Sequence, residues 1–155
     1  TVLFVDVVGS TERVSELGDR RWQALLDQFV STVQLQLQTH RGVLVDRSGD
    51  GILATFDGTA RAIRCAWGIR DSLQRVGLEV RTGLHTGEVT QRQGDVAGIA
   101  VHIGARVSEL AEPGEVLVTR TVRDLVAGSG IDFADRGEFP LKGVPEHWEL
   151  YATSN

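Results

Sequence analysis

The chain begins with an apolar segment, residues 2–8, which is interrupted only by Asp6 and is followed by Gly9, Ser10 and Thr11. Such a continuous apolar run predicts a strand that is buried on both faces of a sheet. The Gly-Ser-Thr turn and the helical pattern after it place a helix N-terminus at the end of that strand. There a carboxylate can hold a divalent cation, and the free N–H groups of Gly9, Ser10 and Thr11 can hold phosphate. The alternative is that Asp6 only caps the helix.

The rest of the chain alternates between helical and strand patterns. The predicted elements are a short helix from Ser10 to Gly18, a helix from Asp19 to about Gly42, strands at Val43–Arg47 and Ile52–Phe56, a helix at Thr59–Arg75, a strand at Leu78–Val89, a helix at Ile99–Ala111, a strand at Val116–Thr119, a short helix at Val122–Ala127, and strands around Phe133 and Leu150. The order begins βαββαβ, which is the ferredoxin-like arrangement. We therefore predict an α+β fold, with a ferredoxin-like βαββαβ core and a C-terminal extension of further helices and strands, in a single domain over residues 1–155.

The topology of that core brings a second carboxylate to the first strand. Strand three of a βαββαβ unit runs antiparallel beside strand one, so the hairpin tip Gly49-Asp50-Gly51 lands next to the end of strand one. Asp6 and Asp50 are then expected to converge at one edge of the sheet. Paired acids beside a phosphate-ready turn are the parts of a two-metal phosphoryl-transfer site. The alternative is a charged hairpin tip that neighbours a capping Asp by chance.

Composition limits the class of partner and the compartment. A net charge of −5 argues against binding a nucleic-acid polymer, which requires a basic face. No apolar run approaches the ~20 residues of a membrane span, so we expect no membrane contact from this segment. Cys65, the only cysteine, lies in the apolar stripe of a predicted helix, and its isolation fits a reducing, cytoplasmic location. The chain lacks Met and begins inside a predicted strand, which favours a domain cut from a longer protein.

Several motifs, in the order found in one family, cover nearly the whole chain. They are Phe4-Val5-Asp6 with Gly9-Ser10-Thr11, Gly49-Asp50-Gly51, Arg81-Thr82-Gly83-Leu84-His85-Thr86-Gly87-Glu88-Val89, Asp95-Val96-Ala97-Gly98 with His102 and Arg106, and Leu141-Lys142-Gly143. On these residues the chain resembles the catalytic domains of class III nucleotidyl (adenylyl or guanylyl) cyclases, most of all the bacterial, actinobacterial-type branch. The resemblance implies a head-to-tail homodimer with active sites at the subunit interface. There ATP would be cyclised to 3′,5′-cyclic AMP and pyrophosphate with two Mg²⁺ or Mn²⁺ ions.

The resemblance also assigns roles at the first motifs. Asp6 and Asp50 would be the metal-binding pair, with Asp6 bridging both ions and the Val7 carbonyl as a further ligand. One ion would help to deprotonate the ribose 3′-hydroxyl, and the other would neutralise the triphosphate. The turn from Gly9 to Thr11 would hold phosphate oxygens.

The later motifs would contribute the base-binding and cationic groups. Asp95, followed by Val96, stands where the family has an acid that accepts a hydrogen bond from the adenine amino group. Arg106 stands where the family has the arginine that stabilises charge on the phosphate in the transition state. Lys142, the only lysine of the chain, lies in the family's Leu-Lys-Gly segment and would contact phosphate.

The spacing of the third long helix bears on two of these residues. His102 and Arg106 are i, i+4 neighbours, so both can project from one edge of the helix. The apolar stripe that they flank consists of Ile99, Ile103, Val107 and Leu110. A cationic pair in this position is compatible with an anionic ligand or with a solvated helix face.

Two positions depart from the pattern of the family. Asp46 stands where adenylyl cyclases carry a lysine that donates to the adenine ring, and a carboxylate can only accept. Guanylyl cyclases carry a glutamate there, so GTP stays open as a second substrate. If Val43 and Val45 face the helices, the alternation of a strand turns Asp46 to the opposite face, where the base and a partner subunit would lie.

The second departure is His102, where the family has an asparagine that positions the ribose. A histidine can donate a hydrogen bond there and, when protonated, add charge. These two changes leave open a degenerate cyclase domain that binds nucleotide without turnover. A diguanylate cyclase is not favoured, because the hairpin Ser48-Gly49-Asp50-Gly51 lacks the Gly-Gly-acid-acid-Phe signature of those domains. His85 lies in a strand motif and is expected to be structural.

Overall fold

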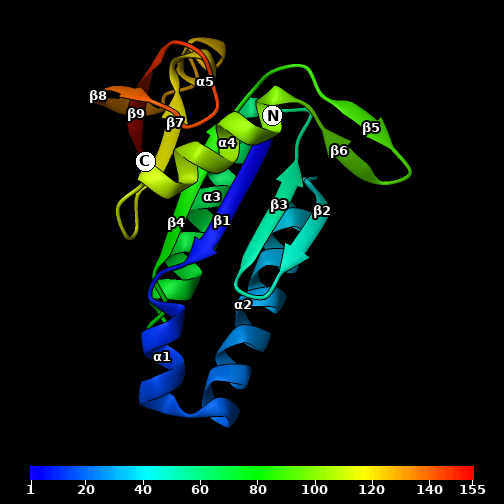
Figure 1. Cartoon of the computed structure of the whole chain (residues 1–155), viewed down its shortest axis with the longest axis vertical. Helices are drawn as coiled ribbons and strands as arrows, with labels where there is room; N and C mark the ends of the chain where they lie inside the picture. Colours follow the sequence, from blue (N-terminus) through cyan, green and yellow to red (C-terminus); the bar gives the residue numbers. More distant parts are fainter.

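The computed structural model describes residues 1–155 and is built on one long mixed sheet with helices on both faces (Figure 1). Its elements in chain order are β1 (Val2–Val7), α1 (Ser10–Leu17), α2 (Asp19–Thr39), β2 (Val43–Ser48), β3 (Gly51–Thr55), α3 (Thr59–Gln74), β4 (Val80–His85), β5 (Thr90–Arg92), β6 (Asp95–Ala97), α4 (Ile99–Leu110), β7 (Val116–Thr119), α5 (Arg120–Leu125), β8 (Asp132–Pro140) and β9 (His147–Ser154).

The order of the strands confirms the predicted core. The main sheet has seven strands in the order β2-β3-β1-β4-β7-β9-β8, and β1 is antiparallel to both of its neighbours, β3 and β4. The first four strands of this order are the ferredoxin-like arrangement. The C-terminal extension adds to the same sheet, because β7 pairs in parallel with β4 and β9 then pairs antiparallel with β7. The α+β class predicted from the sequence is therefore correct.

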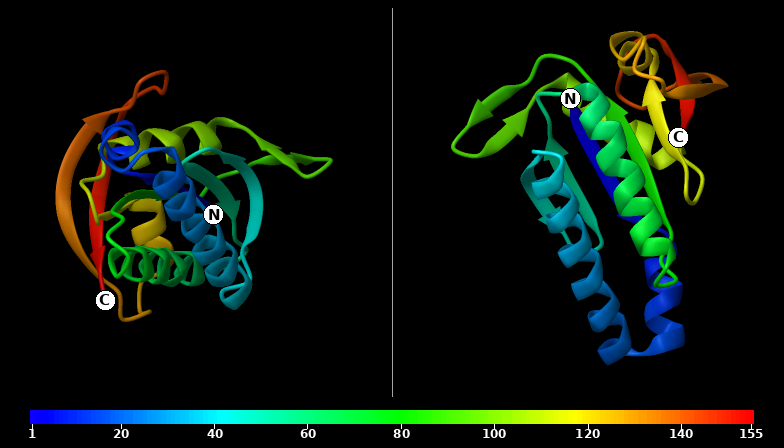
Figure 2. Two further views of the ribbon diagram at one scale, coloured as in Figure 1. Left: turned by 90° about the horizontal axis from the view of Figure 1, so that it is seen from below. Right: turned by 180° about the vertical axis from the view of Figure 1, so that it is seen from behind.

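The alternation of β1 divides the molecule into two layers. Leu3, Val5 and Val7 are buried in the larger core, to which α2 and α3 contribute Phe29, Val33, Ile63 and Ile69 among others. The two views agree that α2 and α3 cover one face of the sheet while α4 crosses the other (Figures 1 and 2). Each fully buried Leu, Ile or Phe on the covered face stabilises the fold by about 1.5–3 kcal/mol. The even-numbered positions of β1 consequently point toward the α4 side, and Asp6 is one of them.

The connection after β1 is shaped by two glycines. Gly9 and Gly18, at the ends of α1, have φ values of +65° and +79°, a region that other residues rarely adopt. They allow the chain to turn sharply into α1 and again into α2, as predicted from the break at Gly18. The resulting pair of helix segments projects beyond the end of the sheet (Figure 2). None of the helices is both long enough and apolar enough to span a membrane.

One predicted strand is shorter than expected, and a separate hairpin that was not predicted follows it. The strand predicted at Leu78–Val89 is β4, which ends at His85, and residues 90–97 form the separate β5–β6 hairpin. Gln93 and Gly94, at its tip, have φ values of +51° and +83°, which suits a two-residue hairpin turn. Each of these strands has only three residues, and β5 contains no apolar residue, so periodicity could not reveal them. The hairpin projects from the body of the molecule (Figure 1).

Candidate active site

The end of β1 and the β2–β3 hairpin tip meet as the topology predicted. Asp6 lies opposite Gly51 in the β1–β3 register, and the Val7 N–H donates to the Asp50 carbonyl oxygen at 2.9 Å. A Cβ at Gly51 would overlap Asp6 Oδ1, so only glycine leaves room for the carboxylate there. Backbone pairing thus holds the two acidic residues together at the end of the strand.

The electrostatic environment of Asp6 and Asp50 favours a bound cation. Burial raises the pKa of Asp6 above its usual range, and the nearby charges of Asp50 and Glu109 raise it further. A hydrogen bond from Ser108 and the charge of Arg81 act in the opposite direction. Neither Asp6 nor Asp50 forms a salt bridge within the chain, so a divalent cation fits the uncompensated pair. Two carboxylates do not complete the coordination of an ion, and phosphate oxygens, water or the Val7 carbonyl would supply further ligands.

The turn after β1 presents unpartnered N–H groups beside this pair. The first intrahelical hydrogen bond of α1 runs from the Arg13 N–H to the Gly9 carbonyl at 3.0 Å. The N–H groups of Ser10 and Thr11, which precede it, have no intrahelical acceptor, and no side chain caps the helix. Gly9, Ser10 and Thr11 line a hollow of about 700 Å³. They can therefore donate to an anion in that hollow.

Other charged side chains line the same hollow, and one of them was not assigned a role from the sequence. Arg81 lies opposite Asp6 in the β1–β4 register, lines the hollow, and has a buried Nε atom without a hydrogen-bond partner. Glu12 and Glu79 also line it, so a triphosphate there needs the arginine and metal charge to offset them. Arg81 belongs to the motif quoted above, but its role was missed because only the strand register shows that it stands beside Asp6.

A second hollow, of about 570 Å³, lies on the α4 side of the sheet and gathers the predicted base-binding residues. Its lining includes Asp6, Asp46, Asp95, Val96 and His102, which come from four separate elements. Asp46 and Asp95 each use Oδ1 to accept the N–H of the following residue at 2.9 Å, which leaves the Oδ2 atoms for a ligand. Glu109, another residue that was not predicted, also lines this hollow.

Asp46 lines this hollow, but β2 does not follow the simple alternation that was predicted for it. The β2–β3 register shifts between Leu44 and Asp46, so a bulge interrupts the simple two-residue period of the strand. Val43 is 62% exposed and is not part of the buried core. Asp46 nevertheless lies on the α4 side of the sheet, facing away from α2 and α3 as the alternation predicted.

The structure does not bring every predicted residue into these two hollows. Asp50 lines a third, smaller hollow of about 270 Å³ together with Ser10, Thr11 and Trp22. Arg106 and Lys142 line none of the three. Arg106 Nη1 instead donates to both carboxylate oxygens of Glu109, at 2.9 and 3.0 Å, while its Nε is buried without a partner.

His85 is a structural residue, as its motif suggested. It is 4% exposed, its Nδ1 is 2.7 Å from Thr119 Oγ1, and its ring meets Trp148 edge to face at 5.4 Å. Burial lowers the pKa of His85 to about 4, which keeps the imidazole neutral near pH 7.

Comparison with known proteins agrees with this geometry. The family model described as the adenylate and guanylate cyclase catalytic domain matches residues 1–155. The chain belongs to this family. It is therefore a class III nucleotidyl cyclase catalytic domain. Both adenylyl and guanylyl cyclases occur among the proteins that it resembles.

Three relatives illustrate the range of this cyclase family. A Rhizobium meliloti protein that is named provisionally as adenylate cyclase 3 is 29% identical over 99% of this chain. The adenylyl cyclase CyaB of P. aeruginosa superposes with a TM-score of 0.87 at 20% identity, covering 99% of this chain and 92% of that chain. The guanylate cyclase domain of RhGC from Catenaria anguillulae, solved in complex with GTP, superposes with a TM-score of 0.84 at 17% identity, covering 99% and 94%. These solved structures show the fold of this cyclase domain.

The cyclase domain is shorter than the curated relatives that it matches. It spans 28% of the Rhizobium meliloti protein. It spans 52% of an uncharacterised Mycobacterium tuberculosis protein that is 33% identical over 94% of this chain.

Proposed function

We propose that this cyclase domain converts ATP to 3′,5′-cyclic AMP and pyrophosphate, with two Mg²⁺ or Mn²⁺ ions, in a head-to-tail homodimer. The observation that carries the proposal is the placement of Asp6 and Asp50 beside a turn with free N–H groups. The reaction joins the ribose 3′-oxygen to the α-phosphorus and releases pyrophosphate. It therefore needs positive charge both at the attacking oxygen and along the triphosphate.

The end of β1 would hold the metal and the triphosphate. Asp6, Asp50 and the Val7 carbonyl are the proposed metal ligands, and the β1–β3 pairing holds the backbones of these residues side by side. When bound, Mg²⁺ or Mn²⁺ would supply the charge that acidifies the 3′-hydroxyl and neutralises the triphosphate. The N–H groups of Ser10 and Thr11 would donate to phosphate oxygens, and the Arg81 guanidinium would pair with them from β4.

The hollow on the α4 side would bind the base. The free oxygen of Asp95 can accept the adenine amino group, with Val96 alongside it. Asp46 cannot donate to a ring nitrogen. Because guanine presents ring N–H and amino donors, the acidic pair of Asp46 and Asp95 makes GTP the second candidate substrate.

The cationic groups that the site lacks within one chain would come from a second copy. Arg106 and Lys142 would act on the triphosphate held by the partner's β1 end. Exposed apolar side chains lie on two of the elements that contribute to this site: Val43 (62% exposed) and Leu44 (38%) on β2, and Ile99 (56%) on α4. Burial of such a surface favours association of two chains. The base hollow of one protomer would then face the metal pair of its partner.

A product assay tests the proposed activity. The purified chain is incubated with Mn²⁺ and with ATP or GTP in parallel, and cyclic nucleotide is separated from substrate. Wild type is expected to form product, cyclic AMP in excess of cyclic GMP, and Asp50→Asn is expected to form none. Equal trace product from wild type and Asp50→Asn would contradict an enzymatic role. Calorimetric binding of metal–ATP without any product would instead identify a domain that binds nucleotide without turnover.

Mixing two inactive variants tests the shared site. Asp50→Asn and Arg106→Ala each damage both sites of their own homodimer, but a mixed dimer has one site with neither change. At equal concentrations, mixing is expected to restore about one quarter of wild-type activity. Specific activity of wild type should also rise with protein concentration. Absence of any rescue, with a flat concentration dependence, would contradict a head-to-tail dimer.

A further inference from the structure

His102 is already engaged within its own chain. Its Nε2 lies 2.9 Å from the carbonyl oxygen of Lys142. A carbonyl can only accept, so the imidazole donates through Nε2 and carries its proton there. Only Nδ1 remains for any other partner. The bond joins α4 to the segment between β8 and β9, forty positions further along the chain.

The segment that accepts this bond is a tight turn. The Val144 N–H donates to the Leu141 carbonyl at 3.0 Å, which closes a four-residue turn with Lys142 and Gly143 at its centre. Gly143 has a φ of +81°, whereas Lys142 does not have a positive φ, and this combination fits a type II turn. The Lys142 carbonyl belongs to the central peptide unit, whose orientation distinguishes type II from type I. The bond from His102 therefore holds that peptide unit in one orientation.

The close approach of the imidazole also explains the glycine. A Cβ at Gly143 would lie 2.9 Å from His102 Nε2, closer than a side chain tolerates. Glycine is favoured at this position by its φ, and a Cβ there would displace the imidazole from its contact with the turn.

The turn is anchored at its ends but not at its tip. Leu141 is 4% exposed and packs with Ile103 and Val107 of α4, and Val144 packs against the same cluster. Lys142 and Gly143, between these anchors, are exposed. The bond from His102 is the side-chain hydrogen bond that the structure provides at this tip.

We propose that His102 is a positioning residue, which holds the Leu141–Val144 turn through the Lys142 carbonyl and so determines where the Lys142 side chain stands beside α4. The inference rests on the proposed function, in which Lys142 and Arg106 together contact the triphosphate bound to the partner subunit. His102 and Arg106 lie one turn apart on α4. The hydrogen bond from His102 therefore ties the Lys142 turn to the helix that carries Arg106, and holds these two cationic residues in a fixed relative position. The competing role is direct contact with the ribose, as expected from the asparagine that the family carries at this position.

Replacing His102 with Gln or with Asn distinguishes the positioning role from direct ribose contact, because the two amide groups lie at different distances from the backbone. Gln Nε2 is four bonds from Cα, as is His Nε2, so His102→Gln can keep the bond to Lys142. Asn Nδ2 is three bonds from Cα, as is His Nδ1, so His102→Asn loses that bond but supplies the family's ribose contact. We expect kcat/KM to stay within about twofold of wild type for His102→Gln and to fall about tenfold for His102→Asn. His147→Asn, at an exposed position on β9, is the matched control and should leave kcat/KM unchanged.

A double-mutant cycle shows whether His102 acts through Lys142. If it does, His102→Asn should cause no further loss of kcat/KM in the Lys142→Ala background. A further loss of about tenfold in that background, or an Asn variant at least as active as the Gln variant, would overturn the proposal in favour of direct ribose contact.

Amide exchange provides a readout that does not depend on activity. The exchange rate of the Val144 N–H, measured by NMR, reports how often the turn opens. We expect it to rise about tenfold in His102→Asn and to match wild type in His102→Gln and His147→Asn. Equal exchange in wild type and His102→Asn would overturn the proposal. If wild type formed no cyclic nucleotide, the proposed function would fail while this measurement still decided the positioning role.

Discussion

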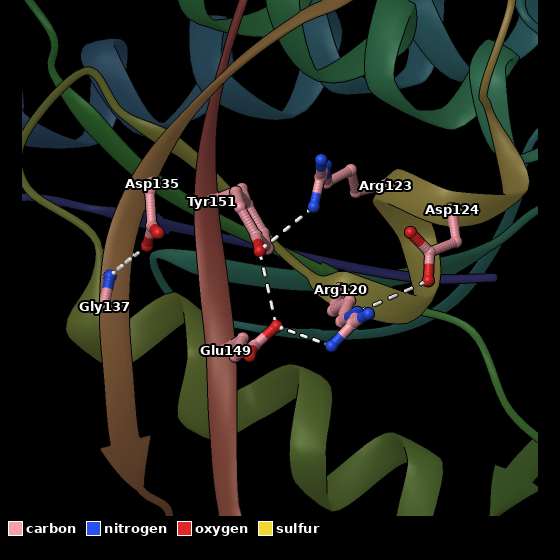
Figure 3. A network of polar contacts seen from close by, with 7 residues as sticks. All are labelled: Arg120, Arg123, Asp124, Asp135, Gly137, Glu149 and Tyr151. Carbon is pink, nitrogen blue, oxygen red and sulfur yellow. Dashed lines mark hydrogen bonds and ion pairs between the residues drawn. The ribbon is translucent and has the colours of Figure 1, made fainter.

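Arginines between α5, β8 and β9 have partners within the chain, whereas the charged groups at the end of β1 are largely left without them. Arg120 pairs with Glu149 at 3.1 Å and with Asp124 at 3.6 Å (Figure 3). Arg123 donates to the Tyr151 hydroxyl at 3.1 Å and lies 4.6 Å from the centre of its ring. The network needs nothing from outside the chain to balance its charges.

At the end of β1, by contrast, several charged side chains lack a partner within the chain. Asp6 and Asp50 stand together without a salt bridge, and Arg81 Nε is buried without a hydrogen-bond partner. Arg106 Nε is likewise buried and unpartnered, although its Nη1 reaches Glu109. The same residue types are therefore paired with one another in one region and largely left without salt-bridge or hydrogen-bond partners in the other, where we propose that they bind metal and triphosphate. We therefore expect substitutions at the proposed site to lower activity more than stability. Substitutions in the network of α5 and β9 should lower stability more than activity.

The largest effect is expected from the metal pair. Asp50→Asn keeps the size of the side chain but removes a proposed metal ligand, so the rate of cyclic AMP formation should fall at least about a thousandfold. Glu149→Gln, the matched change in the C-terminal network, should retain activity within about twofold. Activity of Asp50→Asn above a tenth of wild type would show that the metal pair has been misassigned.

Two helical arginines make the next comparison. Arg106→Ala should lower kcat by about a hundredfold, because in the proposed mechanism it removes the charge that would stabilise the transition state. Arg123→Ala, on α5, should leave kcat near the wild-type value. Steady-state kinetics with Mn²⁺ and ATP measure both. Equal losses in the two variants would mean that Arg106 has no special role.

In thermal unfolding, we expect Arg123→Ala to have the larger effect and Arg106→Ala the smaller one. Arg123→Ala removes both a hydrogen bond and the stacking on Tyr151, so it should destabilise the domain by about 1 kcal/mol, or about 2–4 °C in Tm. Arg106→Ala removes a partly exposed pair with Glu109 and should cost less than about 0.5 kcal/mol. Calorimetry of both variants gives the measurement. A larger loss for Arg106→Ala would contradict the division between the two regions.

The smallest expected effect is a gain in stability on removal of a charged side chain. The pKa of Asp6 is raised in the folded state, so its ionised carboxylate destabilises the metal-free fold at neutral pH. Asp6→Asn should therefore raise the free energy of unfolding at pH 7.5 in EDTA, by less than about 1 kcal/mol because the site is partly solvated. The gain should shrink as pH falls through the raised pKa and wild type becomes protonated.

A paired carboxylate provides the control for that experiment. Asp124→Asn, which loses the Arg120 contact, should not stabilise the domain at any pH. Mn²⁺ should raise the Tm of wild type but not that of Asp6→Asn, because only wild type retains the ligand. A stability loss in metal-free Asp6→Asn at pH 7.5 would contradict the uncompensated pair.

Much of the candidate metal site could be predicted from local patterns. The apolar run of β1, the glycine breaks around α1 and the hairpin signal at Gly49-Asp50-Gly51 are short-range features. Once their order reads βαββαβ, antiparallel pairing leaves the hairpin tip only one place to lie, beside Asp6. The convergence of Asp6 and Asp50 follows from that constraint and needs no knowledge of side-chain packing.

Other parts of the site depended on contacts that the chain order does not constrain. The β5–β6 hairpin has no apolar alternation, the bulge in β2 changes the period at Asp46, and Arg81 is recognised only through its register with Asp6. The bond from His102 to Lys142 joins residues far apart in the sequence through a turn whose place depends on the packing of Leu141. Local patterns determine which elements form and which strand ends meet, because backbone pairing obeys short-range rules. The directions of the polar side chains were decided by tertiary packing, because each depends on neighbours from distant segments.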